Sequence, residues 1–483
     1  MIRTKAVVKY LGVILLFNSL FMLIAAVISL AYREDSFYSL LLSALIGVAI
    51  GTCCTFFIGR VGDIRFHEGL AISVLGWVTT CLSGLLPFLL WGGEFTFANA
   101  LFESVSGYTT TGASILVNIE GLTKGLLFWR SSTSFIGGLG IILFVLLIIP
   151  EKKGSKSYIF RAEVSDLSKF SIAERSKHLI RAVSIVYISL ITLETILLKL
   201  LGMTFFDAIC HSFSTIATSG FSTKNLSIAA YDNVWIEVVV MFFMLISSVH
   251  FLLIWSTMNG KKQNIFTSLP TRMYVLVMFI AIILITLQLY NENLYGFWNS
   301  LRHASFQVIS LASTTGLASA DSEGWPLFTI IILLYLSIQC GMVGSTTGGI
   351  KFDRIYIYFS SLIKQLKQTL HPEGLYVVKF NNYVVDQGLE KQISIFIVLY
   401  ILTFSITTLL LSLFGLDGMT ALSASIATLG NVGPGFGNVS SLANYSQFPD
   451  AAKYLLTANM FLGRLEIVNI LALVLMLFRK RDR

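Results

Sequence analysis

The stretch Glu103-Ser-Val-Ser-Gly-Tyr-Thr-Thr-Thr-Gly-Ala113 is polar and contains two glycines, yet it lies between two long apolar runs. Similar stretches occur three more times, as Ser214-Thr-Ile-Ala-Thr-Ser-Gly-Phe-Ser222, Leu311-Ala-Ser-Thr-Thr-Gly-Leu-Ala-Ser319 and the more divergent Ala427-Thr-Leu-Gly-Asn-Val-Gly-Pro-Gly435. Each follows a short amphipathic segment and separates two hydrophobic runs of membrane length. The chain therefore repeats one unit, made of an apolar span, a short helix, a Thr/Ser-Gly loop and a second apolar span.

This repeated unit predicts a pore. Non-helical backbone is tolerated at membrane depth only where it is buried in protein or lines water. Glycine has no Cβ, so it lets such a loop turn its carbonyl groups toward a common axis. Loops of this kind around one axis would form rings of carbonyl oxygens that replace the hydration shell of K⁺. The alternative is a set of ordinary Ser/Thr/Gly turns, which would explain one loop better than a repeated one.

The composition indicates an all-α polytopic membrane protein. Of the 483 residues, 55% are hydrophobic and 12% are charged, whereas soluble domains carry about 25% charged residues. The five cysteines are scattered, which argues against a disulfide framework or a zinc site. No nucleotide-binding glycine fingerprint follows a strand, so a nucleotide is expected to act only through a partner subunit, and no bound cofactor is expected.

Hydrophobic run length predicts four pseudo-symmetric helix–pore-loop–helix repeats around one pore, preceded by two extra transmembrane helices. The expected spans are 7–31, 37–59, 69–92, 123–150, 179–202, 232–257, 271–290, 326–349, 392–415 and 452–478. The expected pore helices are 97–107, 206–215, 297–309 and 418–428. The chain then divides into a leading two-helix domain, 1–68, and pore repeats at 69–176, 177–269, 270–390 and 391–483.

The distribution of the 34 Lys and Arg residues predicts the orientation. Most of them fall in one set of short loops and at both ends of the chain, which the positive-inside rule places in the cytoplasm. The net charge of +8 thus reflects topology, with attraction to acidic membrane lipid as a second effect, and nucleic acid is not an expected partner. The longer cytoplasmic loops 151–177 and 351–390 fit either an interfacial amphipathic helix or a docking surface.

Several motifs together resemble one family. They are Ser106-Gly-Tyr-Thr-Thr-Thr-Gly-Ala113, Phe128-Trp-Arg-Ser131, Ile136-Gly-Gly-Leu-Gly-Ile141, Gly344-Ser-Thr-Thr-Gly-Gly-Ile-Lys351, Asn431-Val-Gly-Pro-Gly435 and Gly463-Arg-Leu-Glu466. With them the chain resembles, over nearly its whole length, the TrkH/TrkG-type potassium uptake proteins of the Trk/Ktr/HKT superfamily. The resemblance implies a pseudo-fourfold pore in a bacterial cytoplasmic membrane, a homodimer, and gating by a cytoplasmic nucleotide-binding ring of the TrkA type.

The carbonyl groups of the repeated loops are the candidate K⁺ ligands, forming a selectivity filter. In the family, a glycine at the key position of all four loops favours K⁺ over Na⁺, and this chain has all four. The candidate filter residues are Thr110, Thr111, Gly112, Thr218, Ser219, Gly220, Thr314, Thr315, Gly316, Asn431, Val432 and Gly433. Here K⁺ is the transported substrate, and no catalytic residue is assigned.

Three charged residues inside the apolar regions need partners or a function. Glu103 lies in a pore helix, where a structural hydrogen bond is favoured over direct contact with K⁺. Arg464 lies within the last span, and either pairs with Glu466 or Glu103 or projects its charge into the pore below the filter. Arg130 is nearer a helix end, where snorkelling to the interface accounts for it.

The run Cys340-Gly-Met-Val-Gly-Ser-Thr-Thr-Gly-Gly349 interrupts the third repeat's last span. Its glycines and threonines disfavour helix, so the run is expected to form a loop beneath the filter. The alternative is a small-residue surface for helix packing. The candidate gate residues are Gly341, Gly344, Ser345, Thr346, Thr347, Gly348, Gly349 and Arg464.

Two other functions compete with a channel-like uptake pore. An ion-coupled secondary transporter, a K⁺/H⁺ or K⁺/Na⁺ symporter, could use the same site, but broken-helix transporters usually show two related halves rather than four related units. An intramembrane enzyme would need a nucleophile–base pair or paired carboxylates within the spans, and the sequence shows no such set.

Overall fold

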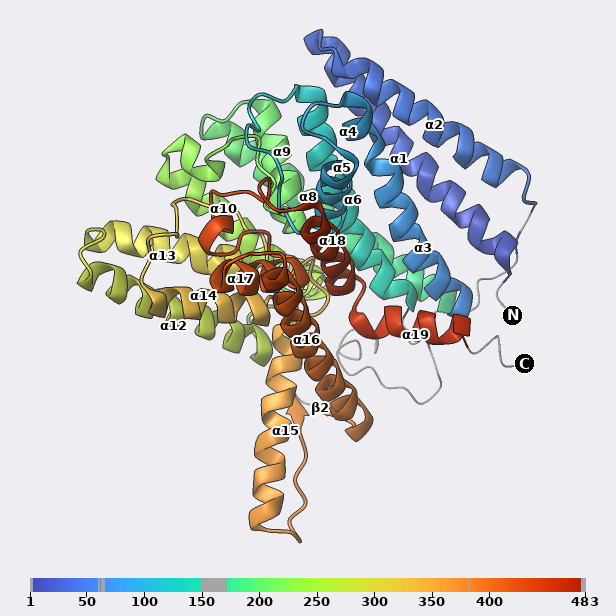
Figure 1. Ribbon diagram of the computed structural model, residues 1–483. Coiled ribbons are helices and arrows are strands. Elements are labelled where there is room, and N and C mark those ends of the chain that lie inside the picture. Colours follow the sequence, from blue (N-terminus) through green and yellow to red (C-terminus); the bar gives the residue numbers. More distant parts are fainter. Residues whose placement is uncertain (1–2, 60, 62–65, 149–171, 382, 479–483) are drawn as a thin grey trace.

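The computed structural model describes residues 3–59, 61, 66–148, 172–381 and 383–478, and this part of the chain is almost entirely helical (Figure 1). The described strands are β1 (Lys379–Phe380) and β2 (Tyr383–Val384), which pair in antiparallel fashion. Residues 149–171, which include most of the expected cytoplasmic loop 151–177, and residues 479–483 lie outside the described residues.

The leading pair consists of α1 (Thr4–Tyr32) and α2 (Ser36–Phe56), which lie side by side at one edge of the molecule (Figure 1). Their close approach depends on small residues, because a Cβ at Gly47 would lie only 2.2 Å from Ser19 Oγ. The Glu34 carboxylate accepts the backbone N–H groups of Lys124 and Gly125 at 2.8 and 3.0 Å. This contact caps the positive end of a helix in the first repeat and holds the pair against it.

Four helical repeats follow. The first contains α3 (Phe66–Gly84), α4 (Leu86–Trp91), the pore helix α5 (Phe97–Tyr108) and α6 (Lys124–Ile148). The second contains α8 (Ile172–Leu200), the pore helix α9 (Phe205–Ala217), the 3₁₀ helix η1 (Ser227–Tyr231), α10 (Val234–Ser247) and α11 (Phe251–Met258). The third contains α12 (Leu269–Asn291), the pore helix α13 (Phe297–Ala312) and α14 (Leu327–Gln339). The fourth contains α16 (Gln387–Leu413), the pore helix α17 (Gly418–Leu429), the 3₁₀ helix η2 (Gly437–Val439), α18 (Asp450–Arg464) and α19 (Ile467–Phe478).

The third and fourth repeats are joined by α15 (Phe352–Leu370), an amphipathic helix that projects away from the helical body with the β1–β2 hairpin at its side (Figure 1). It forms about half of the segment expected as the cytoplasmic loop 351–390. Its exposed apolar side chains include Phe359, Ile363 and Leu366.

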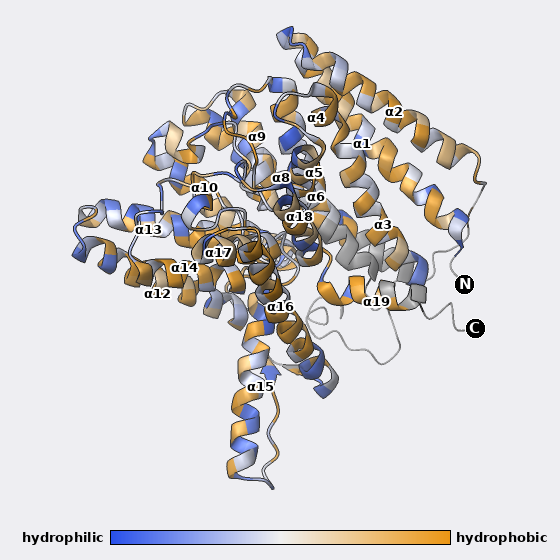
Figure 2. Cartoon of the chain, in the orientation of Figure 1, coloured by the Kyte–Doolittle hydropathy of each residue, from blue (hydrophilic) through white to orange (hydrophobic). Residues whose placement is uncertain are grey.

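In the part of the chain that the structure describes, six helical stretches are long and apolar enough to cross a membrane, or up to eight if each of two bent helix pairs is one span. In each of the six, less than half of the apolar window is buried inside the protein. The rest faces outward, as the apolar surfaces of α2 and α16 do (Figure 2). Such outward apolar surface is what a hydrocarbon environment requires.

Two spans expected to be continuous are broken, so the sequence interpretation of 232–257 and 452–478 was wrong. The chain bends by 103° between α10 and α11, and by 97° between α18 and α19. At the first bend, His250 Nδ1 accepts the Leu252 N–H and caps α11. At the second, Glu466 has a left-handed φ of 62°, which ends the helix.

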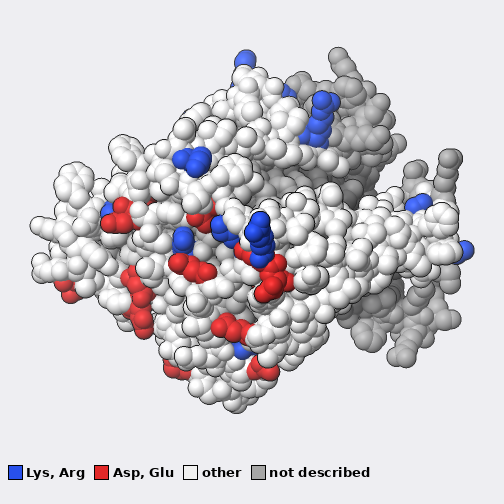
Figure 3. Space-filling model, turned by 90° about the horizontal axis from the view of Figure 1, so that it is seen from above, with Lys and Arg blue, Asp and Glu red and all other residues white. Residues whose placement is uncertain are grey.

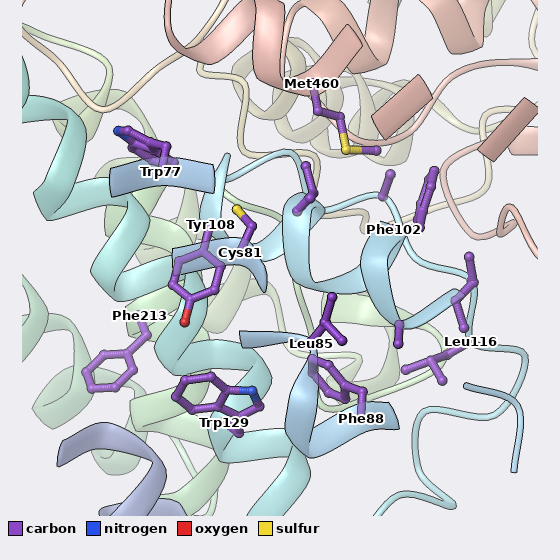
Figure 4. Close-up of a cluster of buried hydrophobic side chains, with 14 of the residues drawn as sticks. Trp77, Cys81, Leu85, Phe88, Phe102, Tyr108, Leu116, Trp129, Phe213 and Met460 are labelled. Carbon is purple, nitrogen blue, oxygen red and sulfur yellow. The ribbon is translucent and has the colours of Figure 1, made fainter. Parts of the chain in front are cut away.

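The first pore helix is embedded in the largest apolar core (Figure 4). Its Phe102 and Tyr108 lie among Trp129 of α6, Phe213 of α9 and Met460 of α18. The Tyr108 hydroxyl donates to Asn18 Oδ1 at 3.1 Å. Because α5 packs against helices of the first and fourth repeats and bonds α1 of the leading pair, its C-terminal end, where the first loop begins, has little freedom to move.

Candidate functional site

The four repeated loops form a closed ring. A Cβ added at Gly112 would lie 1.6 Å from the carbonyl oxygen of Ser219, and one added at Gly220 would lie 2.3 Å from that of Thr315. A Cβ added at Gly316 would lie 2.2 Å from the Val432 carbonyl oxygen, and one added at Gly433 would lie 2.5 Å from the Thr111 carbonyl oxygen. Each loop therefore meets the next in chain order, and the fourth closes on the first.

All four loops share one backbone conformation. The first residue is left-handed in each, with φ of 53° at Thr110, 56° at Thr218, 56° at Thr314 and 53° at Asn431. The glycine two residues later is also left-handed, with φ between 73° and 98°. A left-handed threonine is unusual and costs free energy, so surrounding contacts must impose it.

Those contacts come from the pore helices. In each loop, the N–H of the middle residue donates to a carbonyl near the end of its own pore helix, at 2.8–2.9 Å. The pairs are Thr111 to Ser106, Ser219 to Ser214, Thr315 to Ser310 and Val432 to Ala427. Within the described part of the chain, no protein donor bonds the carbonyl oxygens of the first two residues of any loop. These oxygens are available to a cation.

A cavity of about 180 Å³ opens onto this ring, and the glycines of all four loops line it. Arg130 and Lys224 also reach the cavity wall. Lys224 lies 3.8 Å from the Glu120 carboxylate, so its charge is partly balanced. Acidic and basic side chains mix over the central part of the face seen in Figure 3. A cation can therefore approach the opening of this cavity without crossing a surface of uniformly positive charge.

Glu103 and Arg130 form a buried ion pair behind the first loop. Arg130 Nε lies 2.6 Å from Glu103 Oε1, and its Nη1 donates to the Ser222 carbonyl at 2.9 Å. Glu103 also accepts the Ser114 hydroxyl at 3.0 Å and the Ile115 N–H at 3.1 Å. The expected structural role of Glu103 is confirmed. The snorkelling interpretation of Arg130 was wrong, since this residue is only 2% exposed and connects the first loop to the second.

Residues 340–349 form a buried loop, and α14 ends at Gln339 as the glycine content predicts. The Thr346 hydroxyl donates to the Ile216 carbonyl at 3.0 Å, and the Gly348 N–H donates to Thr314 Oγ1 at 3.2 Å. A Cβ at Gly348 would lie 2.2 Å from the Gly430 carbonyl oxygen. The loop thus contacts the second, third and fourth repeats directly beside the four-loop ring. The helix-packing alternative for this run was wrong, because these residues are not helical.

Arg464 ends α18 and bonds this loop. Its Nη1 donates to the Thr346 carbonyl at 2.6 Å, and its Nη2 to the Gly137 carbonyl at 3.3 Å. The expected pairing with Glu466 or Glu103 does not occur: Glu466 bonds Arg354 at 2.5 Å, and Glu103 bonds Arg130. Arg464 is 3% exposed, and no carboxylate of the described residues bonds its side chain. Within this part of the chain, its positive charge is therefore not neutralised by an ion pair.

Three residues beside this loop were missed by the sequence interpretation. Lys351 Nζ bonds the Thr347 carbonyl oxygen, and Asp353 Oδ2 accepts the Val343 N–H at 2.6 Å. The ring of His250 lies against Gly344, where an added Cβ would be 2.6 Å from Nε2. Lys351 ends the Gly344–Lys351 motif, which is the one signal that could have singled it out.

Comparison with known proteins agrees with this architecture. The sequence model of the TrkH family, described as cation transport protein, matches residues 60–480. The Trk system potassium uptake protein TrkH of Escherichia coli is 32% identical over 97% of this chain and 98% of its own length. The Trk system potassium uptake protein TrkG of the same organism is 31% identical over 98% of each chain.

The crystal structure of the potassium transporter TrkH from Vibrio parahaemolyticus superposes with a TM-score of 0.88. Its sequence is 30% identical, and the match covers 98% of each chain. A family match over most of the chain, relatives above 30% identity and one shared architecture agree with each other. This chain belongs to the TrkH family of cation transport proteins.

Proposed function

We propose that this protein carries K⁺ into the cell across a bacterial cytoplasmic membrane, through the centre of the four-loop ring. The observation that carries the proposal is the ring of backbone carbonyl oxygens from the first two residues of each loop, which have no protein donor among the described residues and repeat in the same conformation. Carbonyl rings of this kind can replace the hydration shell of K⁺. The relatives at 31–32% identity are named as potassium uptake proteins, which supports the same cargo.

In this proposal, the ion ligands come from all four loops. They are the backbone groups of Thr110, Thr111, Gly112, Thr218, Ser219, Gly220, Thr314, Thr315, Gly316, Asn431, Val432 and Gly433. The glycines leave no room for a side chain, since an added Cβ would approach a carbonyl of the next loop within 1.6–2.5 Å. Their close contact sets the ring diameter, and this diameter favours K⁺ over the smaller, more strongly hydrated Na⁺.

The 340–349 loop and Arg464 form the proposed gate. The loop lies against Thr314 on the side of the filter where Arg464 also approaches. An unneutralised guanidinium in a low-dielectric passage repels cations, so this arrangement would hinder conduction. The loop leads through Lys351 into α15, which projects from the helical body (Figure 1). A partner that binds α15 would therefore be able to move the loop.

The regulatory partner is proposed to be a nucleotide-binding ring of the TrkA type on the cytoplasmic side, with the chain itself acting as a homodimer in the membrane lipid. Both termini would then be cytoplasmic, and nucleotide would act only through the partner. The functional units would be 1–68, 69–176, 177–269, 270–390 with the gate at 340–349, and 391–483.

Uptake of ⁸⁶Rb⁺ into liposomes that contain the purified protein tests the transport proposal directly. Internal ⁸⁶Rb⁺ should accumulate under an inside-negative potential, and external K⁺ should compete at far lower concentration than Na⁺. Equal competition by K⁺ and Na⁺ would overturn K⁺ selectivity. A requirement for a proton or Na⁺ gradient, with the potential clamped, would instead favour the ion-coupled symporter using the same site.

A further inference from the structure

Glu194 is a fully buried carboxyl group within a candidate membrane span, Leu179–Leu200 of α8. Within the described part of the chain, neither of its carboxyl oxygens has a hydrogen-bond partner. The side chain of Thr215, on the second pore helix, faces this carboxyl group. The Thr215 hydroxyl is itself buried and also has no partner of acceptable geometry. Two buried polar groups therefore face each other without an acceptable hydrogen bond.

The helices that contact α8 supply no counter-charge. These helices are α6, α9, α10 and α11. Their charged and titratable side chains are engaged elsewhere: Lys124 with the Tyr32 ring, Arg130 with Glu103, Asp207 with Thr223, His211 with Asp207 and Ser222, Glu237 with Arg302, His250 with Leu252, and the thiol of Cys210 beside Ser131. On α8 itself, Arg181 and Lys199 are exposed and Tyr187 bonds the Phe135 carbonyl.

An ionised carboxylate is very costly in such surroundings. Removing a carboxylate from water without a cation or hydrogen-bond donors is far more expensive than burying the neutral acid. Within a membrane span, the usual solutions are a paired charge, a water-filled cavity or a bound proton. The described residues offer no paired charge. A neutral acid also gains an O–H group, which can donate to Thr215 Oγ1 after a small rotation of the carboxyl group.

We propose that Glu194 is a proton-binding site behind the second filter loop, occupied by a proton at neutral pH and coupled to the geometry of that loop. The proton site stands on burial and missing partners alone. Its coupling to transport rests on the proposed function of the filter.

The coupling runs through Thr215, which anchors the start of the second filter loop. The Thr215 carbonyl accepts the Thr218 N–H at 3.0 Å and the Ser247 hydroxyl at 3.4 Å. If Glu194 lost its proton, the carboxylate would need a donor, and the Thr215 hydroxyl is the group that faces it. Reorienting or hydrating Thr215 would disturb the carbonyl that holds Thr218. Proton occupancy at Glu194 should therefore affect the second loop more than the other three.

Infrared spectroscopy of the purified protein tests the proton site without requiring transport. The wild-type spectrum at neutral pH should contain a protonated-carboxyl C=O band that is absent from Glu194→Gln. The matched control Glu292→Gln neutralises an exposed carboxylate at the end of α12 and should keep the band. If the variant folds poorly, alkaline titration of the wild-type protein supplies the same information, because the band should disappear as Glu194 ionises. A wild-type spectrum with no such band overturns the proton site.

Competition between K⁺ and Na⁺ for ⁸⁶Rb⁺ uptake tests the coupling. In the wild-type protein and in Glu292→Gln, K⁺ discrimination should fall several-fold at the alkaline pH where the band disappears. In Glu194→Gln this fall should be absent, because an amide cannot ionise. The same pH profile in Glu194→Gln and the wild-type protein would overturn the coupling. If the band behaves as expected but no variant transports ⁸⁶Rb⁺ selectively, the proposed function fails and the proton site stands.

Discussion

Arg130 Nε and Glu103 Oε1 lie 2.6 Å apart in a buried site, so the first and second of the four repeated loops share one buried ion pair. Glu103 holds the backbone just after the first loop, and Arg130 holds the Ser222 carbonyl just after the second. The guanidinium also stacks over the Phe221 ring at 3.6 Å from its centroid. These two residues thus link two neighbouring loops of the four-loop ring and help to set the spacing between them.

Removal of one partner from this pair should strongly destabilise the protein. Arg130→Met leaves the Glu103 carboxylate buried without a counter-charge, a change that typically costs about 3–5 kcal/mol. We expect a clear fall in the thermal unfolding midpoint in detergent. Lys224→Met is a suitable control, because the Lys224–Glu120 pair is partly exposed and its loss should cost less than about 1 kcal/mol. Similar midpoints for the two variants would contradict a structural role for Arg130.

Gly112→Ser should weaken K⁺ selectivity and also lower stability. The new Cβ would lie 1.6 Å from the Ser219 carbonyl oxygen, so the two loops must separate and the ring must widen. A serine at a φ of 78° adds backbone strain of about 1–3 kcal/mol. Competition of K⁺ and Na⁺ against ⁸⁶Rb⁺, together with the unfolding midpoint, measures both effects.

The control for this change is Gly296→Ser, at the start of the third pore helix. There φ is −63° and an added Cβ meets no atom within 4 Å. Serine is also a favourable residue at a helix start. Unchanged K⁺/Na⁺ competition in Gly112→Ser would remove Gly112 from the filter.

Arg464→Ala should raise cation flux. At an effective dielectric constant of about 20, two unit charges about 6 Å apart repel by roughly 3 kcal/mol, so a guanidinium near the path is a substantial barrier. We expect ⁸⁶Rb⁺ uptake to rise several-fold or more. Arg464→Lys keeps the charge and should raise uptake less. If uptake falls together with the unfolding midpoint, the hydrogen bonds of Arg464 to Thr346 and Gly137 matter more than its charge.

Deletion of 343–347 should increase basal flux and weaken the response to a cytoplasmic partner. The deletion removes Thr346, whose hydroxyl donates to the Ile216 carbonyl and whose own carbonyl accepts a hydrogen bond from Arg464. Without these contacts, the 340–349 loop and Arg464 would no longer obstruct the proposed ion passage below Thr314. Flux with and without the partner and nucleotide measures both effects. A folded deletion protein with wild-type basal flux and a full partner response would rule out this gate.

Asp353, in the first turn of α15, should give the protein a pH-dependent stability. Burial raises the pKa of Asp353 to about 6 from its ordinary 3.8, and Oδ1 has no hydrogen-bond partner within the described residues. A raised carboxyl pKa means that the folded state binds the proton more tightly than the unfolded state. The stabilisation is fully present below pH 3.8 and is lost as pH rises through about 6.

The variant Asp353→Asn cannot ionise, so it should be at least as stable as the wild-type protein at pH 7 and should lack this loss. Unfolding midpoints across this pH window measure the difference. Asp386→Asn, at the exposed start of α16, changes the same chemical group outside the buried cluster and is the control. Parallel profiles for Asp353→Asn and the wild-type protein would show that Asp353 does not titrate in this window.

The sequence by itself determined the repeated loops and the interruption at 340–349, because these depend on local composition. Glycine and threonine between apolar runs disfavour helix wherever the chain places them. The end of α14 at Gln339 and the left-handed glycines at 112, 220, 316 and 433 follow from that local preference. The left-handed conformation of Asn431 is also locally tolerated.

Only the tertiary structure decided the charge partners, the left-handed threonines and the two sharp bends. Arg130 could pair with Glu103 because α5 and α6 meet behind the filter, a contact between residues far apart in the chain. The bend at 248–250 contains no glycine or proline; it is held by the His250 cap and by the bond from the Met342 N–H to the Ser248 carbonyl. Thr110, Thr218 and Thr314 are left-handed against their own preference because hydrogen bonds to the pore helices outweigh the local cost.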